Sequence, residues 1–175
     1  MDPLIKIGTP APNFQLYDLN GELHSLESMH GRIVVLDFWS AECDWCERID
    51  RELVNYLLEW ENQVKVWWIA SNANEPPDLI ARVAGERKLP TLLVDPDQAV
   101  ADMYDAQMTP HFFVVDTVGK LAYQGAWDDI TFRQRTATRL YVPQAIKAMT
   151  RGRVPEITQT PAYGCVLVRY RENPG

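Results

Sequence analysis

The chain has 175 residues, of which 46% are hydrophobic, and a formal net charge of -7. This length and apolar content favour one domain with a buried core and argue against intrinsic disorder. The negative charge argues against nucleic acid or an anionic membrane surface as the main partner.

The N-terminal part predicts a β-hairpin. Residues 14–18 and 23–25 flank Asn20-Gly21, a dipeptide that is typical of hairpin turns. Residues 1–12 are rich in proline, and we expect them to be extended.

A buried strand and an amphipathic helix follow. Residues 33–39 are almost continuously apolar, which predicts a strand that is covered on both faces. From Cys46 to Trp60, apolar residues recur every three or four positions with charged residues such as Asp50 between them, as in a helix with one apolar stripe. Cys43 and Cys46 therefore lie where a core strand leads into a helix.

The rest of the chain alternates between strands and helices. Strands are expected at 64–70, 89–94, 111–116 and 121–125, and helices at 78–88, 98–104 and 128–149, with Pro143 breaking or restarting the last helix. A loop and then a strand at about 165–170 complete the chain. This order predicts an α/β fold with a mixed central sheet and helices on both faces. We expect one domain over residues 1–150 and an extension over 151–175 that packs on it.

The position of the two cysteines favours their reactivity as thiolates. A helix N-terminus carries partial positive charge and stabilises a thiolate, so we expect a solvent-accessible Cys43 with a lowered pKa. Cys46 lies on the inward stripe, close enough to close a small disulfide ring with Cys43. The pattern predicts that Cys43 attacks a partner disulfide and that Cys46 resolves the mixed disulfide. The chain has three cysteines, so they cannot all pair internally, and a C-x-x-C beside alternating strands and helices indicates redox chemistry.

Residues 37–46, followed by Thr109-Pro110, resemble the active-site segment of the thioredoxin superfamily. The hairpin and the segment 71–108 resemble its redoxin branch, which includes periplasmic thiol–disulfide oxidoreductases and cytochrome-maturation thioredoxins. Residues 161–169 also look like the C-terminal strand of a bacterial redoxin-domain subgroup. The resemblance implies a thioredoxin-like three-layer α/β/α fold with a central mixed sheet, an N-terminal β-hairpin and a short C-terminal strand extension.

The resemblance also implies roles for individual residues. Cys43 and Cys46 match the redox pair, whose disulfide carries two electrons without any other cofactor. Pro110 matches the cis-proline that packs against this disulfide and exposes backbone for substrate pairing. Asp37 matches the buried acid that helps to deprotonate the resolving thiol.

Other residues are candidates for contact with substrate or depart from the family pattern. Glu42, Trp45, Thr109 and Pro110 are expected to contact substrate. Glu42 stands immediately before the first cysteine, where the family usually has a tryptophan. Two carboxylates, at positions 42 and 44, flank Cys43 and disfavour its thiolate, which favours a reductant over an oxidant. The expected partners are protein thiols and disulfides, with an upstream donor reductase or a membrane thiol transporter.

Several alternatives remain open at this level. A copper or zinc carrier could use the thiolates of Cys43 and Cys46, with His111 as a further ligand, and a redox-silent interaction module could use the same fold. His111 could also tune the thiols or face solvent. Cys165 lies in a predicted apolar strand, where it could be a small hydrophobic residue of the core or could act as a redox relay. A peroxidase is disfavoured, because Leu36 and Ser40 stand where peroxiredoxins have proline and threonine.

The sequence also bears on location. It contains no run of about 18 apolar residues, the length that a membrane-spanning helix needs. The first residues, Met-Asp-Pro-Leu-Ile-Lys, lack the apolar core of a signal peptide. As written, the sequence predicts a cytoplasmic protein without membrane insertion, although a chain from which a signal had been removed would look the same and would be periplasmic.

Overall fold

The computed structural model describes residues 5–170, and the two ends of the chain lie outside the described residues. The strands are β1 (Gln15–Asp18), β2 (Leu23–Ser25), β3 (Ile33–Trp39), β4 (Val64–Ala70), β5 (Leu92–Val94), β6 (Met108–Thr109), β7 (His111–Val115), β8 (Leu121–Gly125) and β9 (Cys165–Val166). The helices are α1 (Asp44–Trp60), α2 (Pro77–Glu86), α3 (Ala99–Met103) and α4 (Tyr141–Thr150), with a 3-10 turn η1 at Glu27–Met29. None of these helices is long and apolar enough to cross a membrane.

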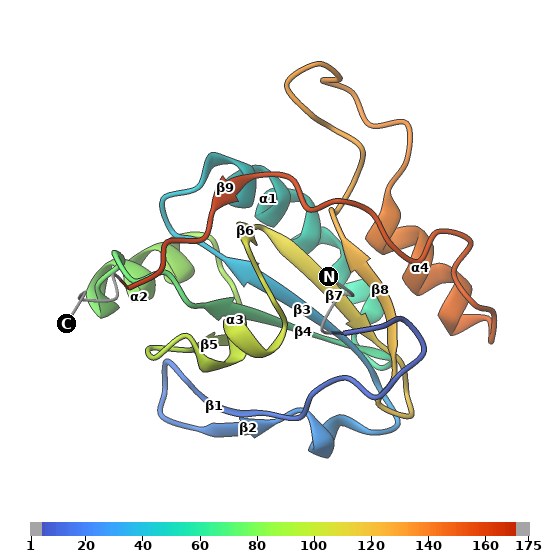
Figure 1. Cartoon of the computed structure of the whole chain (residues 1–175), viewed down its shortest axis with the longest axis horizontal. Coiled ribbons are helices and arrows are strands. Elements are labelled where there is room, and N and C mark those ends of the chain that lie inside the picture. The colour runs from blue at the N-terminus through green and yellow to red at the C-terminus, as the bar shows by residue number, and fades with distance from the viewer. Residues whose placement is uncertain (1–4, 171–175) are drawn as a thin grey trace.

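The central sheet is mixed, as the sequence predicts. Its strand order is β2-β1-β5-β4-β3-β7-β8. The three inner strands β3, β4 and β5 are parallel, and the hairpin β1–β2 and the pair β7–β8 extend the sheet with antiparallel strands at its two sides (Figure 1). The expected fold class is therefore confirmed.

The two faces of the sheet carry separate hydrophobic clusters. Successive side chains of a strand point to opposite faces. In β3, Val34, Leu36 and Phe38 belong to the cluster that also contains residues of α3 and of the N-terminal segment. The alternate residues of β3 belong to the cluster that α1, α2 and α4 cover. The same alternation places Asp37 on the α1 side of the sheet.

Helix α1 begins immediately after the first cysteine. Cys43 is its N-cap residue, and Asp44 and Glu47 in its first turn place negative charge at the positive end of the helix dipole. Ile49 and Leu53 are buried in the cluster below the helix. The apolar stripe predicted from the sequence therefore fixes how α1 lies on the sheet, and the cysteines lie at its first turn.

The segment before α4 differs from the sequence prediction. Residues 126–140 form an irregular loop where a helix was expected. The carboxylate of Asp129 accepts hydrogen bonds from the main-chain N–H groups of Thr138 and Arg139 and from the Thr138 hydroxyl. Such local bonds to aspartate compete with helical hydrogen bonds and favour the loop.

Pro143 then lies in the first turn of α4. Its missing N–H would have no partner inside the helix at that position, so proline is tolerated there. The helix thus restarts near the proline, one of the two outcomes that the sequence suggested.

The C-terminal segment returns along the sheet edge to the first turn of α1. Gln124 of β8 exchanges main-chain hydrogen bonds with Thr158 and Thr160. The segment then reaches β9, which pairs antiparallel with β6 and forms a small separate sheet (Figure 1). The strand is limited to Cys165–Val166, shorter than the predicted strand over residues 165–170.

Candidate active site

Cys43 lies between α1 and the loop that carries Pro110. Its Sγ is 3.3 Å from the carbonyl oxygen of Thr109, and only 2% of the residue is exposed. A disulfide joins Cys43 to Cys165, with a Cα–Cα distance of 6.2 Å and a sequence separation of 122. The sulfur lies at the N-terminus of the 17-residue helix α1, where the helix dipole favours negative charge.

This arrangement departs from the sequence prediction. Cys43 was expected to reach solvent and to form its disulfide with Cys46, but it is buried and bonded to Cys165. The physical reason is strand pairing, because Cys165 lies opposite Thr109 in the β6–β9 ladder and so comes next to Cys43. The sequence indicates a strand near Cys165, but it does not show which edge that strand joins.

Cys46 is a free thiol in the first turn of α1 and is fully buried. Burial raises the pKa of Cys46 well above its ordinary value, and the nearby carboxyl groups of Asp37 and Asp50 raise it further. Because a buried thiol with a raised pKa stays protonated at neutral pH, it needs a proton acceptor before it can attack a disulfide. The role of Cys46 as the resolving thiol remains a prediction.

Asp37 is the candidate for that proton exchange. It is fully buried in β3, and neither of its carboxyl oxygens has a hydrogen-bond partner among residues 5–170. Burial raises the pKa of Asp37 well above its ordinary value, the charge of Asp50 adds to this, and Arg87 opposes it. A buried carboxyl group that has a raised pKa and no fixed partner can take a proton from a thiol or return one. The charge of Asp37 acts on Cys46, and its role in proton transfer stays a prediction.

Pro110 follows a cis peptide bond, which confirms the expectation from the thioredoxin resemblance. Thr109 and Pro110 are both buried. Thr109 directs its main-chain carbonyl at the sulfur of Cys43 and pairs through β6 with β9. The two residues therefore form one wall of the site, and α1 forms the other.

The surface beside the cysteines is aromatic. The ring of Trp45 has its centroid 5.4 Å from that of Phe132 and 5.0 Å from that of Tyr163, in edge-to-face arrangements. Trp45 is half-buried and Phe132 is 72% exposed. Glu42 is exposed on the loop that leads to Cys43. The three rings come from separate segments of the chain and form one aromatic group next to the disulfide.

His111 lies between the domain and the C-terminal segment. It lines a small hollow together with residues 159–162, and its Nδ1 is buried without a hydrogen-bond partner in the part of the chain that the structure describes. Its ring centroid is 4.4 Å from that of Phe113. Burial lowers the pKa of His111 to about 4, although the charge of Asp105 opposes this. The side chain is therefore uncharged at neutral pH.

Comparisons with known proteins agree with this geometry. The sequence profile of the AhpC/TSA family matches residues 7–124, about two thirds of the chain. The chain belongs to the AhpC/TSA family. A curated relative of this AhpC/TSA protein, the thiol-disulfide oxidoreductase ResA of Geobacillus thermodenitrificans (strain NG80-2), is 30% identical over 118 residues, which cover 67% of each chain. The redoxin resemblance seen in the sequence is confirmed.

Two solved structures are similar to this AhpC/TSA protein over most of its length. An uncharacterized conserved protein from Geobacillus kaustophilus has a TM-score of 0.88 at 27% identity and covers 97% of this chain and 95% of its own. A hypothetical protein from Sinorhizobium meliloti 1021 has a TM-score of 0.84 at 27% identity. The match covers 93% of this chain and 94% of the other. The family profile, in contrast, ends at residue 124, so Cys165 and β9 lie outside it.

The sequence analysis missed Glu75, which holds the loop that leads into Cys43. Its carboxylate accepts hydrogen bonds from the Ser40 hydroxyl at 2.5 Å and from the main-chain N–H groups of Ala41 and Glu42 at 3.1 and 3.2 Å. Asn72 is also within 3.4 Å of it. Glu75 belongs to a polar loop with no periodic pattern, so no sequence signal distinguishes it from a solvated acid.

Asp50 was also misjudged, because the helical period places it among the polar residues between the apolar positions of α1. In the structure it is buried and accepts hydrogen bonds from the indole N–H groups of Trp39 and Trp68, at 2.8 and 2.9 Å, and from Arg87 at 3.0 Å. Arg87 also donates to the carbonyl oxygen of Ala41 at 2.8 Å. The network connects α1, two core strands and the loop before Cys43. The sequence pattern gives no signal for this network.

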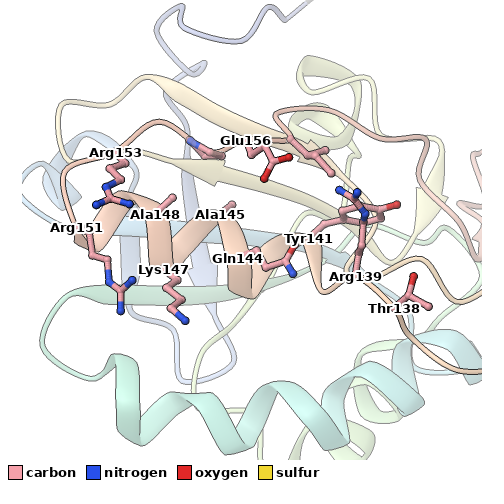
Figure 2. A pocket seen from close by; sticks show the side chains of 12 residues that line it. Thr138, Arg139, Tyr141, Gln144, Ala145, Lys147, Ala148, Arg151, Arg153 and Glu156 are labelled. Carbon is pink, nitrogen blue, oxygen red and sulfur yellow. The ribbon is translucent and has the colours of Figure 1, made fainter.

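A hollow beside α4 takes no part in this site. Polar and basic side chains line it, including Thr138, Arg139, Tyr141, Gln144, Lys147, Arg151, Arg153 and Glu156 (Figure 2). None of them is a candidate site residue. Among the described residues, Asp18, Glu22 and His24 bring possible metal-ligand atoms within 4.8 Å of one another. This group lies on the hairpin, where Asp18 already accepts hydrogen bonds from Asn20 and Glu22, so we assign it no metal.

Proposed function

We propose that this chain is a thiol–disulfide oxidoreductase that acts on protein substrates, with Cys43 as the attacking thiol. The observation that carries the proposal is the position of the Cys43 sulfur, at the N-terminus of α1, 3.3 Å from the main-chain carbonyl of the residue before cis-Pro110, and engaged in a disulfide. The thiol-disulfide oxidoreductase named among its relatives supports the same reaction class.

In this proposal the reaction is a pair of thiol–disulfide exchanges. The thiolate of Cys43 attacks one sulfur of a substrate disulfide, forms a mixed disulfide and releases the other substrate sulfur as a thiolate. A second cysteine of the chain then attacks Cys43 and releases the substrate as a dithiol. The sequence predicts Cys46 for this step, with Asp37 as its proton acceptor. The disulfide itself carries the two electrons, so the proposed reaction uses no other cofactor.

The surface next to Cys43 supports a protein as the substrate. Trp45, Phe132 and Tyr163 present aromatic area, and aromatic residues are enriched in protein interfaces. The main chain at Thr109 can pair with an extended polypeptide, as its pairing with β9 demonstrates. Substrate binding by Glu42, Trp45, Thr109 and Pro110 therefore belongs to the proposal.

We further propose that the protein acts as a reductant. Glu42 and Asp44 are both exposed beside Cys43, and their charges disfavour the thiolate and hence the reduced form. An upstream dithiol donor, either a soluble reductase or a membrane thiol transporter, would return the electrons. A reduction potential below about -200 mV would support this direction, and one near about -120 mV, typical of strongly oxidising enzymes, would contradict it.

Two other readings have less support. A metal carrier would use the reduced thiols of Cys43 and Cys46, but a closed zinc site needs four ligands and the chain has a single C-x-x-C. A peroxidase remains disfavoured because Leu36 and Ser40 stand where the peroxidase pattern has proline and threonine. Location in the cytoplasm or outside it stays a prediction that fractionation of cells would test.

The test is insulin reduction with dithiothreitol as the electron source. We expect wild type to accelerate the reaction, and Cys43→Ser to lose about 10³-fold or more of the rate, as removal of an attacking nucleophile does in other enzymes. Circular dichroism of the variant shows whether the fold is retained. Equal rates for wild type and a folded Cys43→Ser protein would contradict the proposal and favour a redox-silent interaction module.

A further inference from the structure

The C-terminal strand β9 occupies the place where a substrate strand would bind. Thr109, the residue before cis-Pro110, pairs with Cys165, and Met108 pairs with Val166 in an antiparallel ladder. Addition of an extended segment to a free backbone edge is a general mode of peptide recognition. In this chain the added segment is its own C-terminal part, and it delivers a cysteine to Cys43.

Gly164 shows that this docking is encoded in the sequence. A Cβ atom at position 164 would lie 2.1 Å from the carbonyl oxygen of Thr109 and 2.9 Å from Cδ of Pro110. Both contacts are shorter than real Cβ atoms allow, and both involve backbone or ring atoms that cannot move aside easily. Glycine is therefore required for β9 to approach the cis-proline loop this closely.

The segment on the C-terminal side of Cys165 is tied to the domain by polar contacts. The main-chain N–H of Leu167 donates to Gln107, and the carbonyl of Val168 accepts from Ala73 and Gln98. The N–H of Val168 donates to the side chain of Asn72 at 2.7 Å. These contacts hold the segment in one defined position on the domain.

The cover that β9 forms has a consequence for the reaction. Because β9 occupies the Thr109 edge and Cys43 is 2% exposed, a substrate strand cannot use that edge until β9 leaves. The Cys43–Cys165 bond is then the intramolecular equivalent of a mixed disulfide between Cys43 and a substrate cysteine. Cys165 is partly exposed, whereas Cys46 is fully buried in the first turn of α1.

We propose that Cys165, the third cysteine of the chain, is a catalytic residue that resolves the mixed disulfide between Cys43 and the substrate when β9 docks on Thr109. This inference rests on the proposed oxidoreductase function and replaces Cys46 with Cys165 in the resolving step. The docking of β9 also displaces the substrate strand, so resolution and product release occur together.

The electrons and atoms of this cycle balance. The Cys43 thiolate attacks the substrate disulfide, forming the mixed disulfide and one substrate thiolate. The Cys165 thiolate then attacks the Cys43 sulfur, so the Cys43–Cys165 bond forms and the bond to the substrate breaks. Two enzyme thiols are oxidised, one substrate disulfide is reduced to two thiols, and the two protons pass from enzyme to substrate. A dithiol reductant returns the enzyme to the reduced state and is itself oxidised to a disulfide.

The decisive experiment follows the mixed disulfide directly. Fully reduced full-length protein is mixed with oxidised glutathione, quenched with acid at successive times, and analysed by mass spectrometry for the Cys43–glutathione adduct. Because a tethered thiol has a large kinetic advantage over one in solution, we expect Cys165→Ser to hold the adduct about tenfold longer than wild type or more. We expect Cys46→Ser to clear it at a rate close to that of wild type.

A variant that keeps all three cysteines separates docking from chemistry. Gly164→Ala should block the approach of β9 and prolong the adduct in the same direction as Cys165→Ser. Gly85→Ala is the matched control, because a Cβ at the exposed position 85 of α2 meets nothing within 4 Å, and we expect it to behave as wild type.

Three outcomes would overturn the proposal. Adduct lifetimes that are equal in Cys165→Ser and Cys46→Ser, or longer in Cys46→Ser, would leave the resolving step to Cys46. A wild-type adduct lifetime in Gly164→Ala would show that β9 docking is not needed. A Cys43–Cys165 disulfide that dithiothreitol reduces only after denaturation would make it a structural bond. Failure of the proposed function itself is distinguishable, because then Cys43 forms no adduct in any variant.

Discussion

In the domain body, by which we mean the central sheet and its covering helices, the seven residues of β3 are all buried and pair with strands on both sides. The C-terminal segment, in contrast, pairs with β6 over two residues and buries mainly Leu167. The side chains of Val166 and Tyr170 are 73% and 57% exposed. The body is held by apolar burial, which is cooperative and large. The segment is held by hydrogen bonds, each worth about 1 kcal/mol net, by the Arg169–Asp102 ion pair and by one reducible bond. Once that bond is reduced, we expect the segment to detach while the body stays folded.

The largest expected effect tests this difference in stability. Leu53→Ala removes a fully buried side chain from the cluster under α1 and should lower the free energy of unfolding by about 3 kcal/mol. Under reducing conditions, Leu167→Ala should change it by less than about 1 kcal/mol, because the segment detaches before the body unfolds. Urea unfolding measures both, and limited proteolysis should show faster cleavage of the segment in Leu167→Ala. Equal losses would mean that the segment and body unfold as one unit.

The second prediction concerns pH and the contact between the two regions. His111 has a pKa of about 4 in the folded protein against about 6.5 in the unfolded chain, so folding favours its neutral form. Its contribution is fully present above pH 6.5 and is lost as the pH falls toward 4, by up to about 3 kcal/mol. His111→Gln should remove this part of the slope in urea unfolding between pH 7 and pH 4.5. An unchanged difference between wild type and variant over that range would contradict the assignment.

The third prediction concerns the loop that lies between the regions. Glu75 bonds the loop before Cys43, and through Asn72 it is connected to Val168 of the segment. Glu75→Gln loses charge-assisted hydrogen bonds and should cost about 2 kcal/mol of stability. Glu86→Gln on the exposed face of α2 is the control, with an expected change within about 0.5 kcal/mol. Thermal unfolding of both variants provides the comparison, and a Glu75→Gln protein as stable as the control would show that these bonds contribute little.

The smallest expected effect lies within the body. The raised pKa of Asp37 means that its contribution is full below about pH 3.8 and is lost as the pH rises through the folded-state pKa. Asp37→Asn should therefore be more stable than wild type at pH 8, by about 1 kcal/mol, and equal to it at pH 3.5. Urea unfolding at the two pH values measures this difference. Lower stability of Asp37→Asn at pH 8 would indicate an unrecognised partner of the carboxylate.

The body was predictable because its signals are local. The apolar run before Cys43 and the helical stripe after it are periodic patterns, and Thr109-Pro110 occurs where the family has its cis-proline. The helix expected over residues 128–149 was wrong before residue 141, because Asp129 bonds the backbone of residues 138 and 139 in a way that periodicity does not reveal.

The active-site cover could not be predicted in the same way. The pairing of Cys43 with Cys165 depends on the path of a segment across the sheet edge, and that path rests on backbone pairing and on the glycine at position 164. Hydrophobic patterns indicate which face of an element is buried, but not which edge a two-residue strand joins. The burial of Asp50 and Glu75 likewise depends on partners distant in sequence.

The long sequence separation between Cys43 and Cys165 also means that formation of their disulfide should raise the thermal stability of the protein. A covalent link between residues 122 apart restricts the disordered chain far more than a ring of four residues does. In the chain-entropy relation the long link disfavours the disordered chain by about 5 kcal/mol, and a Cys43–Cys46 link by about 2 kcal/mol. The protein with a Cys43–Cys165 disulfide should therefore have a higher melting temperature than its reduced form. The size of this increase, measured by calorimetry, distinguishes a bond to Cys165 from a bond to Cys46.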